Sequence, residues 1–460
     1  MLNESIVKEV LQAALSTGGD FAEIFVEDRH DNHISMIGEK IETSNAGRTY
    51  GAGIRIFNGN NSIYGYTNDT SRENLIKVAK EVATSIAGVD KNLGIDLVKK
   101  CTTVINPIKI MPNEVSKNQK IDWLKIAANE AKTYSKEITQ VTGRYMDYVQ
   151  NILVANSEGV YAEDQRVRTR LNVGAVASAN GEMQTGGQDI GAHLGMEIYN
   201  DEALKAIGRE AARVATTMAH AELCPSGKMS AVIDNGFGGV IFHEACGHGL
   251  EATSVAKGTS VYTGKLGQKI ASDVVTAIDD GTIANGWGSF NVNDEGELPT
   301  KNVLLENGVL KSYMIDKLGA RRMNMAQTGA GRRQSYQFAP TSRMTNTYIA
   351  AGESTHDEII KNTEYGIYAK RMGGGSVNPA TGDFNFAVLE GYIVKDGEIK
   401  EPVRGATLIG TGLEVIQKID MVGNELAHGQ GMCGSSSGSI PAWVGQPMVR
   451  VSEITVGGRK

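Results

Sequence analysis

The chain has 460 residues, of which 41% are hydrophobic and 22% charged, and its formal net charge is −7. This negative balance disfavours a general nucleic-acid surface, which is normally basic. No run of ~18 uninterrupted apolar residues exists, so no membrane span is expected. The first residues lack the basic and apolar regions of a secretion signal, and the four cysteines form no C-x-x-C pair. We therefore expect a cytoplasmic protein without a disulfide framework.

Apolar periodicity predicts both helices and strands in the first half of the chain. Apolar residues recur at helical spacing in four segments, 5–16, 71–87, 121–134 and 201–218. Short alternating stretches separated by turn residues predict antiparallel strands at 21–27, 33–37, 49–57, 62–66, 140–146, 149–155 and 160–177. The charge-dense run 163–170 is typical of a solvated strand face.

A turn at Pro225-Ser226-Gly227 follows the last of these helices and indicates a domain boundary. Residues 1–222 would form an N-terminal α+β region, in which a connection near 90–118 separates two subdomains. Beyond the turn, short strands punctuated by glycine dominate, and the 55 glycines of the chain exceed the usual ~7% share. We therefore predict an α+β protein with a mixed α/antiparallel-β N-terminal domain and a strand-rich C-terminal domain at 223–460.

Two histidines and a glutamate lie close together in the sequence His243-Glu244-Ala245-Cys246-Gly247-His248. The related motif H-E-x-x-H places two histidines on one helix face to bind zinc, with the glutamate as general base. Here the spacing is H-E-x-x-x-H, and residues i and i+5 of a regular helix diverge by about 140°. Both rings can reach one ion only if a π-type bulge widens the turn or if Gly247 ends the helix before His248. The alternative is an ordinary buried helix with two unrelated histidines.

A catalytic zinc site normally has three protein ligands and one open position, so a third ligand is needed. The candidates are Cys246, Glu251, His220 and Cys433. Cys246 fits better as a small core residue, and Glu251 could reach the ion if the helix continued. Cys433 lies in a glycine-rich loop, where His428 competes with it. The residue pattern alone leaves the choice open.

The stretch 243–251 resembles the H-E-x-x-x-H signature of the TldD/PmbA metalloproteases, on the TldD side of that family. Other blocks of the chain are also similar to family blocks, namely 278–282, 293–296, 343–347, 373–375, 378–384, 402–406 and 431–434. Together they extend over most of residues 225–460. The residues that depart from the family pattern, for example Trp287, lie outside the metal motif. They bear on substrate preference more than on the reaction itself.

The resemblance implies a zinc metalloprotease, with one zinc per catalytic chain, that acts on unfolded or extended peptides. Residue by residue, His243, His248 and Cys433 match the zinc ligands of TldD-like proteins, so Cys433 is preferred over Glu251. Glu244 matches the catalytic glutamate. Zinc in such a site lowers the pKa of water and polarises the scissile carbonyl, while the glutamate transfers the proton to the leaving amine. The resemblance also implies a dimeric chamber, formed with a TldE/PmbA-like subunit that lacks the metal motif or with a second copy of this chain.

The sequence also offers candidate substrate contacts. Gly373 and Gly374 would permit close backbone approach, although a plain turn explains them equally well. Arg343 could meet a substrate carboxylate, and the pair 332–333 could do so too, but a surface position is more typical of that pair. No dinucleotide fingerprint or phosphate loop is present, so no nucleotide cofactor is expected.

Two other functions stay open. The first is a non-catalytic peptide-binding or maturation subunit with a structural zinc, in which a fourth ligand such as His428 or Glu251 closes the site. The second is a different zinc hydrolase that acts on small amides.

Overall fold

The computed structural model describes residues 1–86, 88, 94–100, 102–378 and 381–459. Parts of the predicted connection near 90–118 and of the 378–384 block lie outside this described part, as do Cys101 and the end of the predicted helix at 71–87.

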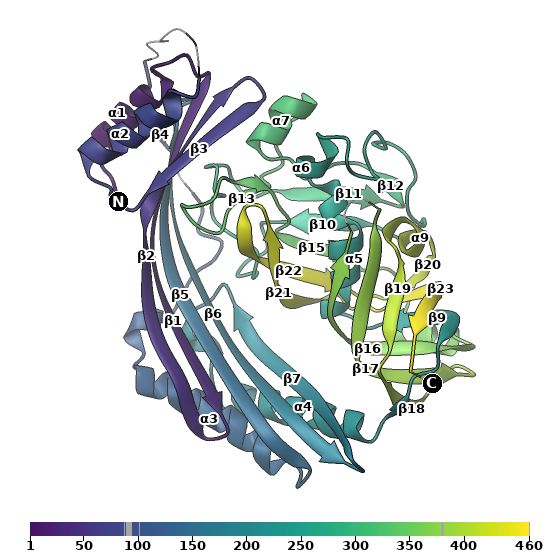
Figure 1. Ribbon diagram of the computed structural model, residues 1–460. Helices are drawn as coiled ribbons and strands as arrows, with labels where there is room; N and C mark the ends of the chain where they lie inside the picture. Colours follow the sequence, from purple (N-terminus) through teal and green to yellow (C-terminus); the bar gives the residue numbers. More distant parts are fainter. Residues whose placement is uncertain (87, 89–93, 101, 379–380, 460) are drawn as a thin grey trace.

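The N-terminal half is built on one long, curved sheet that is antiparallel except for the short parallel pairing of β4 with β6 (Figure 1). Its strand order is β3-β2-β1-β5-β6-β4, with β7 paired to the other part of β6. The strands are β1 (Phe21–Ile37), β2 (Lys40–Asn58), β3 (Asn61–Thr67), β4 (Val98–Lys99), β5 (Ile138–Asn156), β6 (Val160–Ala179) and β7 (Glu182–Ala192).

Strands β1 and β5 are each continuous where the sequence predicted two short strands, so that part of the prediction was wrong. The polar residues between the predicted pieces of β1 pair on both sides, for example Asp28 with Tyr50 of β2 and with Asn151 of β5. A central strand keeps its ladder through such residues because both neighbours satisfy its backbone groups. Local propensity could not show this.

Four helices cover one face of this sheet, and all four were predicted. They are α1 (Glu4–Leu15), α2 (Arg72–Ala83), α3 (Lys117–Thr133) and α4 (Asp201–Ala219). On β1, Ile24 and Val26 pack with α1 and α2, while Ile34 and Met36 pack with α3 and α4. These residues have the same parity and therefore point to the same face. Among the described residues, no helix is long and apolar enough to cross a membrane.

The opposite face of the sheet meets the C-terminal region through buried charges. Arg55 of β2 lies 2.7 Å from both Glu23 and Glu295, and the Arg333 guanidinium lies 2.5 Å from Glu23. Arg166 of β6 lies 2.7 Å from Asp294. The contact between the two halves is thus strongly ionic.

Two sequence predictions are corrected by this interface. Within the run 163–170, Asp164, Arg166 and Arg168 are buried, so the expected solvated face is wrong for these alternate residues. Arg332 and Arg333 are also buried, at 5% and 3% exposure, rather than on the surface. The cause is tertiary, because the two halves cover each other here: the C-terminal region supplies the Asp294 carboxylate and the Ser289 carbonyl to Arg166 and Arg168. The N-terminal sheet in turn supplies the Glu23 carboxylate to Arg333.

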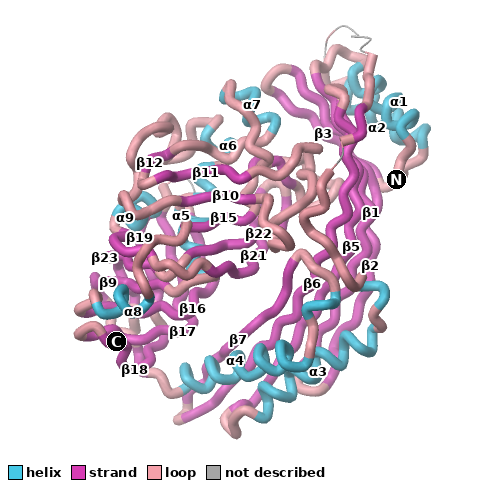
Figure 2. Tube along the Cα trace, turned by 180° about the vertical axis from the view of Figure 1, so that it is seen from behind, coloured by secondary structure: helices cyan, strands magenta, loops and turns pink. Residues whose placement is uncertain are grey.

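The C-terminal half is strand-rich, as predicted, and contains two larger sheets and a small one (Figure 2). The six-stranded sheet has the order β12-β11-β10-β15-β22-β21, with β10 (Ala277–Asp280), β11 (Lys301–Glu306), β12 (Val309–Leu310), β15 (Asn346–Ile349), β21 (Ala427–Ser435) and β22 (Gly438–Gln446). The eight-stranded sheet comprises β8 (Glu222–Leu223), β9 (Gly227–Ile233), β16 (Tyr365–Val377), β17 (Asp383–Lys395), β18 (Glu398–Arg404), β19 (Thr407–Thr411), β20 (Ile419–Val422) and β23 (Val449–Gly457). The small sheet pairs β13 (Gly331–Arg332) with β14 (Thr341–Ser342).

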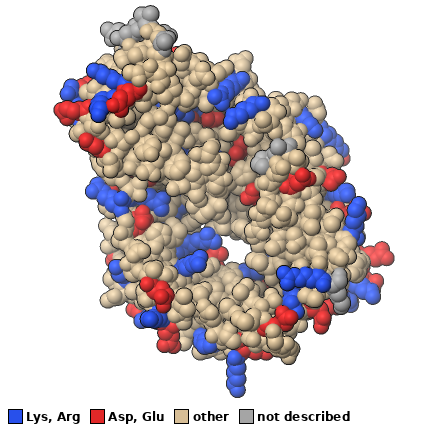
Figure 3. All heavy atoms as spheres, viewed as in Figure 1, with Lys and Arg blue, Asp and Glu red and all other residues tan. Residues whose placement is uncertain are grey.

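Short helices connect these strands: α5 (Val240–Ala245), α6 (Ala252–Val255), α7 (Lys317–Met323), α8 (His356–Lys361) and α9 (Gly412–Gln417). The α+β fold class is therefore confirmed. The space-filling view shows a hollow between the N-terminal sheet and the C-terminal half, with basic side chains beside it (Figure 3).

Candidate metal centre

The histidine motif lies on a helix that ends early. Helix α5 stops at Ala245, Cys246 has φ −123° and ψ −47°, and a 3-10 turn follows over Gly247–Leu250. Of the two distortions that the spacing allows, the chain therefore uses an early helix end, one residue before the predicted Gly247. The break turns the two imidazoles towards each other, with ring centroids 5.2 Å apart.

Gly247 packs closely against Met344. A Cβ at position 247 would lie 2.2 Å from the Met344 sulfur, so a larger residue would require this buried side chain to move. Gly247 thus lets the turn approach the chain segment that follows β14, and this segment also carries Arg343.

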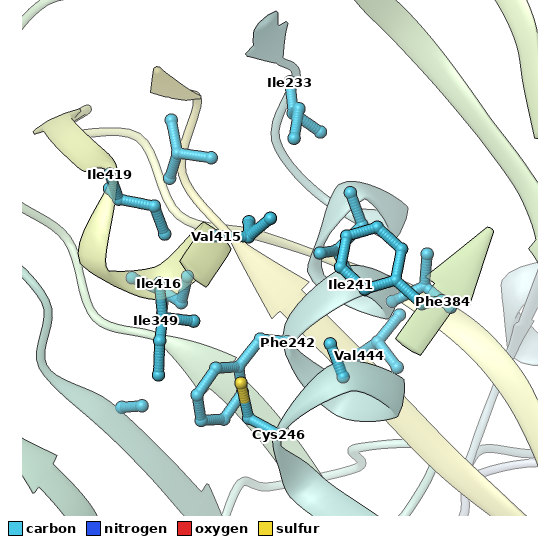
Figure 4. Packing of buried hydrophobic residues seen from close by; sticks show 14 of the residues in the cluster. Ile233, Ile241, Phe242, Cys246, Ile349, Phe384, Val415, Ile416, Ile419 and Val444 are labelled. Carbon is cyan, nitrogen blue, oxygen red and sulfur yellow. The ribbon is translucent and has the colours of Figure 1, made fainter. Parts of the chain in front are cut away.

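The apolar side of α5 fixes the helix in the core (Figure 4). Ile241 and Phe242 lie within one buried cluster with Val415 of α9 and Val444 of β22. Because α5 packs against elements of both larger sheets, its orientation is set by the whole C-terminal half. His243 is held on the side of the helix that meets the β21–β22 hairpin.

Three potential metal ligands converge where α5 meets that hairpin. The Cys433 sulfur lies 3.2 Å from His243 Nε2 and 3.3 Å from His248 Nε2. All three ligand atoms lie within 4.8 Å of one another, and no other residue of the described chain joins this group. In a tetrahedral zinc site, nitrogen and sulfur ligands are about 3.5 Å apart. The donor set and its spacing therefore fit a zinc-type ion with one position left open.

Electrostatic interactions within the cluster favour the metal-binding form of Cys433, but they also favour the protonated form of His248, which must lose its proton before it can bind a metal. Burial alone would raise the pKa of the Cys433 thiol, but attraction by His243 and hydrogen bonds from both imidazoles lower it to about 3. Cys433 is therefore a thiolate at neutral pH, which is the form that binds metals. Burial would lower the pKa of His248, yet the charge of Glu251 and the contact with Cys433 raise it well above its usual value.

Glu244 lies beside the ligand group and outside it. Its carboxylate is 3.6 Å from His248 Nε2, and its side chain is 27% exposed, against 12% for His248. His243 and Cys433 are buried. Glu244 is thus the most accessible of these four side chains, at the solvent-facing side of the cluster.

Glu251 occupies a position behind the ligands. Its carboxylate lies 3.2 Å from His248 Nδ1, which is the ring nitrogen that points away from Cys433. A carboxylate in this position orients the imidazole and fixes the tautomer in which Nε2 faces a metal. The sequence placed Glu251 among candidate ligands, but spacing alone could not show that the broken helix turns it to the far side of the ring.

Arg343 is fully buried and contacts the β21–β22 hairpin. Its guanidinium donates hydrogen bonds to the carbonyl oxygens of Cys433 and Gly438 and to the Ser437 hydroxyl. Because these N–H groups are used inside the protein, Arg343 is placed to hold the hairpin, and its contact with substrate stays a prediction. The sequence carried no signal for the Ser437 contact.

The remaining candidates lie elsewhere. His428 stacks on Trp443, with ring centroids 4.5 Å apart, and His220 pairs with Glu137 at the surface. Cys246 is buried, and its thiol approaches the Gly412 carbonyl. None of the three belongs to the ligand group of the described residues.

The predicted glycines of the substrate site lie on β16. The pairing of β16 with β17 is irregular between Met372 and Gly375, so the chain bulges there. Gly374 is exposed, and a Cβ on it would meet nothing within 4 Å, whereas Gly373 lies against Leu389. Close approach to a ligand at Gly373 and Gly374 stays a prediction.

Comparison with protein families gives three consecutive matches. The PmbA/TldA metallopeptidase domain 1 matches residues 22–86, the central domain matches 110–219, and the C-terminal domain matches 226–458. The last of these segments contains the whole candidate metal centre.

Individual proteins agree with the family matches. The chain is 34% identical to the metalloprotease TldD homolog of Buchnera aphidicola, over 99% of this chain and 96% of the relative. It is 36% identical to that of Haemophilus influenzae, over 95% and 93%. Among solved structures, TldE from Thermococcus kodakarensis has the same fold, with a TM-score of 0.75 at 18% identity over 98% of this chain and all of the other. The three matched segments and the near full-length similarity to TldD homologues show that this chain belongs to the PmbA/TldD metallopeptidase family.

Proposed function

We propose that this chain is a zinc-dependent peptidase that hydrolyses peptide bonds in unfolded or extended peptides. The observation that carries the proposal is the convergence of His243, His248 and Cys433 with Glu244 beside them on the accessible side. Three protein ligands with an open fourth position are the pattern of catalytic zinc sites, whereas structural sites are closed by four.

Each residue of the site has a separate role in hydrolysis. A divalent ion in this site would supply Lewis-acid chemistry, polarising a carbonyl and making water more acidic. Glu244 takes a proton from the attacking water and delivers it to the leaving amine. His243, His248 and Cys433 hold the ion, and Glu251 orients His248 from behind.

The site adjoins a strand edge that suits an extended peptide: beyond the bridge of His428 with Gly236, the outer edge of β21 pairs with no strand of the described chain. Strand β21, which carries Cys433, is the last strand of its sheet and pairs with β22 on one side. An extended peptide can add to such an edge through backbone hydrogen bonds, which select weakly for sequence. The hollow beside the C-terminal half gives room for an unfolded segment (Figure 3).

We further propose that the chain works as one half of a dimer. Its fold matches a solved TldE protein, and the family resemblance implies pairing with a subunit of that kind, which lacks the metal motif. A second copy of this chain is the alternative partner.

The rival function, a peptide-binding subunit with a structural zinc, requires a fourth protein ligand. His428 stacks on Trp443, and Glu251 faces the far nitrogen of His248, so neither candidate belongs to the ligand group. This arrangement favours hydrolysis over a purely structural metal.

The test is peptide cleavage by the purified chain, alone and co-expressed with its related subunit. We expect cleavage of an unstructured peptide of ten or so residues, loss of activity on chelation and recovery on adding zinc. A dipeptide amide should be a much poorer substrate, since it cannot use the strand edge. Cleavage that survives complete metal removal would contradict a metallopeptidase, and equal rates on the dipeptide would favour the small-amide hydrolase.

A further inference from the structure

A pocket rich in arginine lies between the N-terminal sheet and the β21–β22 hairpin. We call it the arginine pocket. Its lining includes the side chains of Arg29, Arg166, Arg168, Arg332 and Arg333. Tyr148, Phe290 and Met432 also line it. Its volume of about 60 Å³ is several times what one water molecule needs, so it can admit a small polar group.

Two of the five arginines are already neutralised. Arg166 lies 2.7 Å from Asp294, the one acidic residue that lines the pocket, and Arg333 pairs with Glu23. The second oxygen of Asp294 accepts from the Arg333 backbone amide at 2.7 Å. Each oxygen of these two carboxylates is thus already engaged, and neither carboxylate forms an ion pair with Arg168 or Arg332 in the described part of the chain.

Arg168 and Arg332 are buried without a carboxylate partner in the described part of the chain. Arg168 donates to the carbonyls of Trp287 and Ser289 and to the Tyr148 hydroxyl, and Arg332 donates to two carbonyls. A guanidinium has five N–H donors, so both keep donors to spare. Burial, followed by repulsion from Arg168, lowers the pKa of Arg332 to about 9.

Arg29 adds a third cation at the same place. Its guanidinium stacks 4.0 Å from the Tyr148 ring centre, and its Nε is buried without a hydrogen-bond partner among the described residues. Its nearest acid, Asp31, is 3.8 Å away. Burying charges without counter-charges is unfavourable, so the two buried guanidinium groups of Arg168 and Arg332, with the partly exposed Arg29 beside them, indicate that an anion belongs in this small cavity.

The pocket is next to the candidate metal centre. Met432 lines it and is the chain neighbour of Cys433, so their Cα atoms are about 3.8 Å apart. Consecutive residues of a strand point to opposite faces, and Met432 pairs with Pro441, which also lines the pocket. The hairpin thus has the metal ligand on one face and the arginine pocket on the other.

We propose that the arginine pocket binds a carboxylate of the peptide substrate, and so gives this peptidase a preference for acidic peptides. The inference rests on the proposed peptidase function. An extended peptide beside β21 places alternate side chains towards the two faces of the hairpin, so a residue close to the scissile bond can reach the pocket. Arginine pairs with carboxylates through two parallel N–H donors, which selects a carboxylate over a neutral amide.

The experiment compares matched peptides with one neutral core. Glutamate replaces glutamine at each position in turn, and a free C-terminal acid replaces the amide, so that side-chain and terminal carboxylates are separated. We expect KM to be at least tenfold lower for one acidic peptide of this set than for its neutral counterpart. Equal KM values throughout the set would overturn the proposal and leave the peptidase function intact.

Substitutions in the arginine pocket then test whether a preference for acidic peptides arises there. Arg29→Gln is the first choice because Arg29 donates no hydrogen bond among the described residues, so the variant loses only the stacking on Tyr148 and the ion pair with Asp31. Arg168→Gln is the second. In both variants, the KM for the acidic peptide should become nearly equal to the KM for the neutral peptide. The surface control Arg209→Gln on α4 should keep the wild-type ratio of these two KM values. A preference that persists in both pocket variants contradicts the assignment.

A binding measurement separates this inference from hydrolysis. A labelled acidic peptide should bind Glu244→Gln protein at least tenfold more tightly than its neutral counterpart, and inorganic phosphate at constant ionic strength should compete weakly. If phosphate binds tightly while peptide carboxylates have no effect, the pocket serves another anion and the proposal fails.

Discussion

Cys433→Ala is expected to lose most of its bound zinc. The sulfur is within 3.3 Å of both histidine Nε2 atoms, and no other ligand in the described chain is placed to take over. Mutating a residue that only hydrogen-bonds to a metal ligand typically lowers metal affinity about 10–100-fold. Removing the thiolate ligand itself should therefore weaken zinc binding by more than about 100-fold. The measurement is zinc per chain after dialysis against a weak chelator.

The matched control is Cys246→Ala, which removes another buried thiol from the same motif. Cys246 lies against Gly412 and outside the ligand group, so this variant should keep its zinc. Equal metal content in Cys433→Ala and wild type would exclude Cys433 and return attention to Glu251.

Glu244→Gln should keep its zinc but lose hydrolysis by a factor of about 10²–10⁴, the usual contribution of a general acid/base. The amide keeps the size of the side chain, and at 27% exposure little packing is disturbed. Because the charge lost is not that of a ligand, zinc content and thermal stability should match the wild type. The measurement is kcat on the extended peptide beside zinc per chain.

Glu425→Gln at the surface serves as the control for a lost carboxylate and should retain full activity. Peptidase activity near wild type in Glu244→Gln would remove this residue from the mechanism, whatever the metal content.

Much of the fold could be predicted from the sequence because its signals are local. Helices α1 to α4 follow apolar periodicity, and the alternation on β6 was visible through residues 160–177. The continuity of the strands could not be predicted from local sequence. Strand β1 continues through Asp28 and Asn32 because β2 and β5 pair with it on both sides. Arg166 and Arg168 looked solvated since their burial depends on a region more than 100 residues away.

The candidate site, like the fold, could be predicted only in part from the sequence. The spacing of His243 and His248 indicated that the helix must be distorted, and an early helix end was one of the two options. Cys433, 185 residues beyond His248, was linked to them by family resemblance and not by any pattern in the chain. The roles of Glu251 and Arg343 depend on side-chain directions that only the folded structure defines.

The central claim is that one zinc is held by two imidazoles and one thiolate with a position left open. X-ray absorption at the zinc edge of the zinc-loaded protein tests it most directly. We expect one sulfur at about 2.3 Å and three nitrogen or oxygen neighbours at about 2.0–2.1 Å, the latter including two imidazoles. A zinc environment without sulfur, or with a third imidazole, would contradict the site formed by His243, His248 and Cys433.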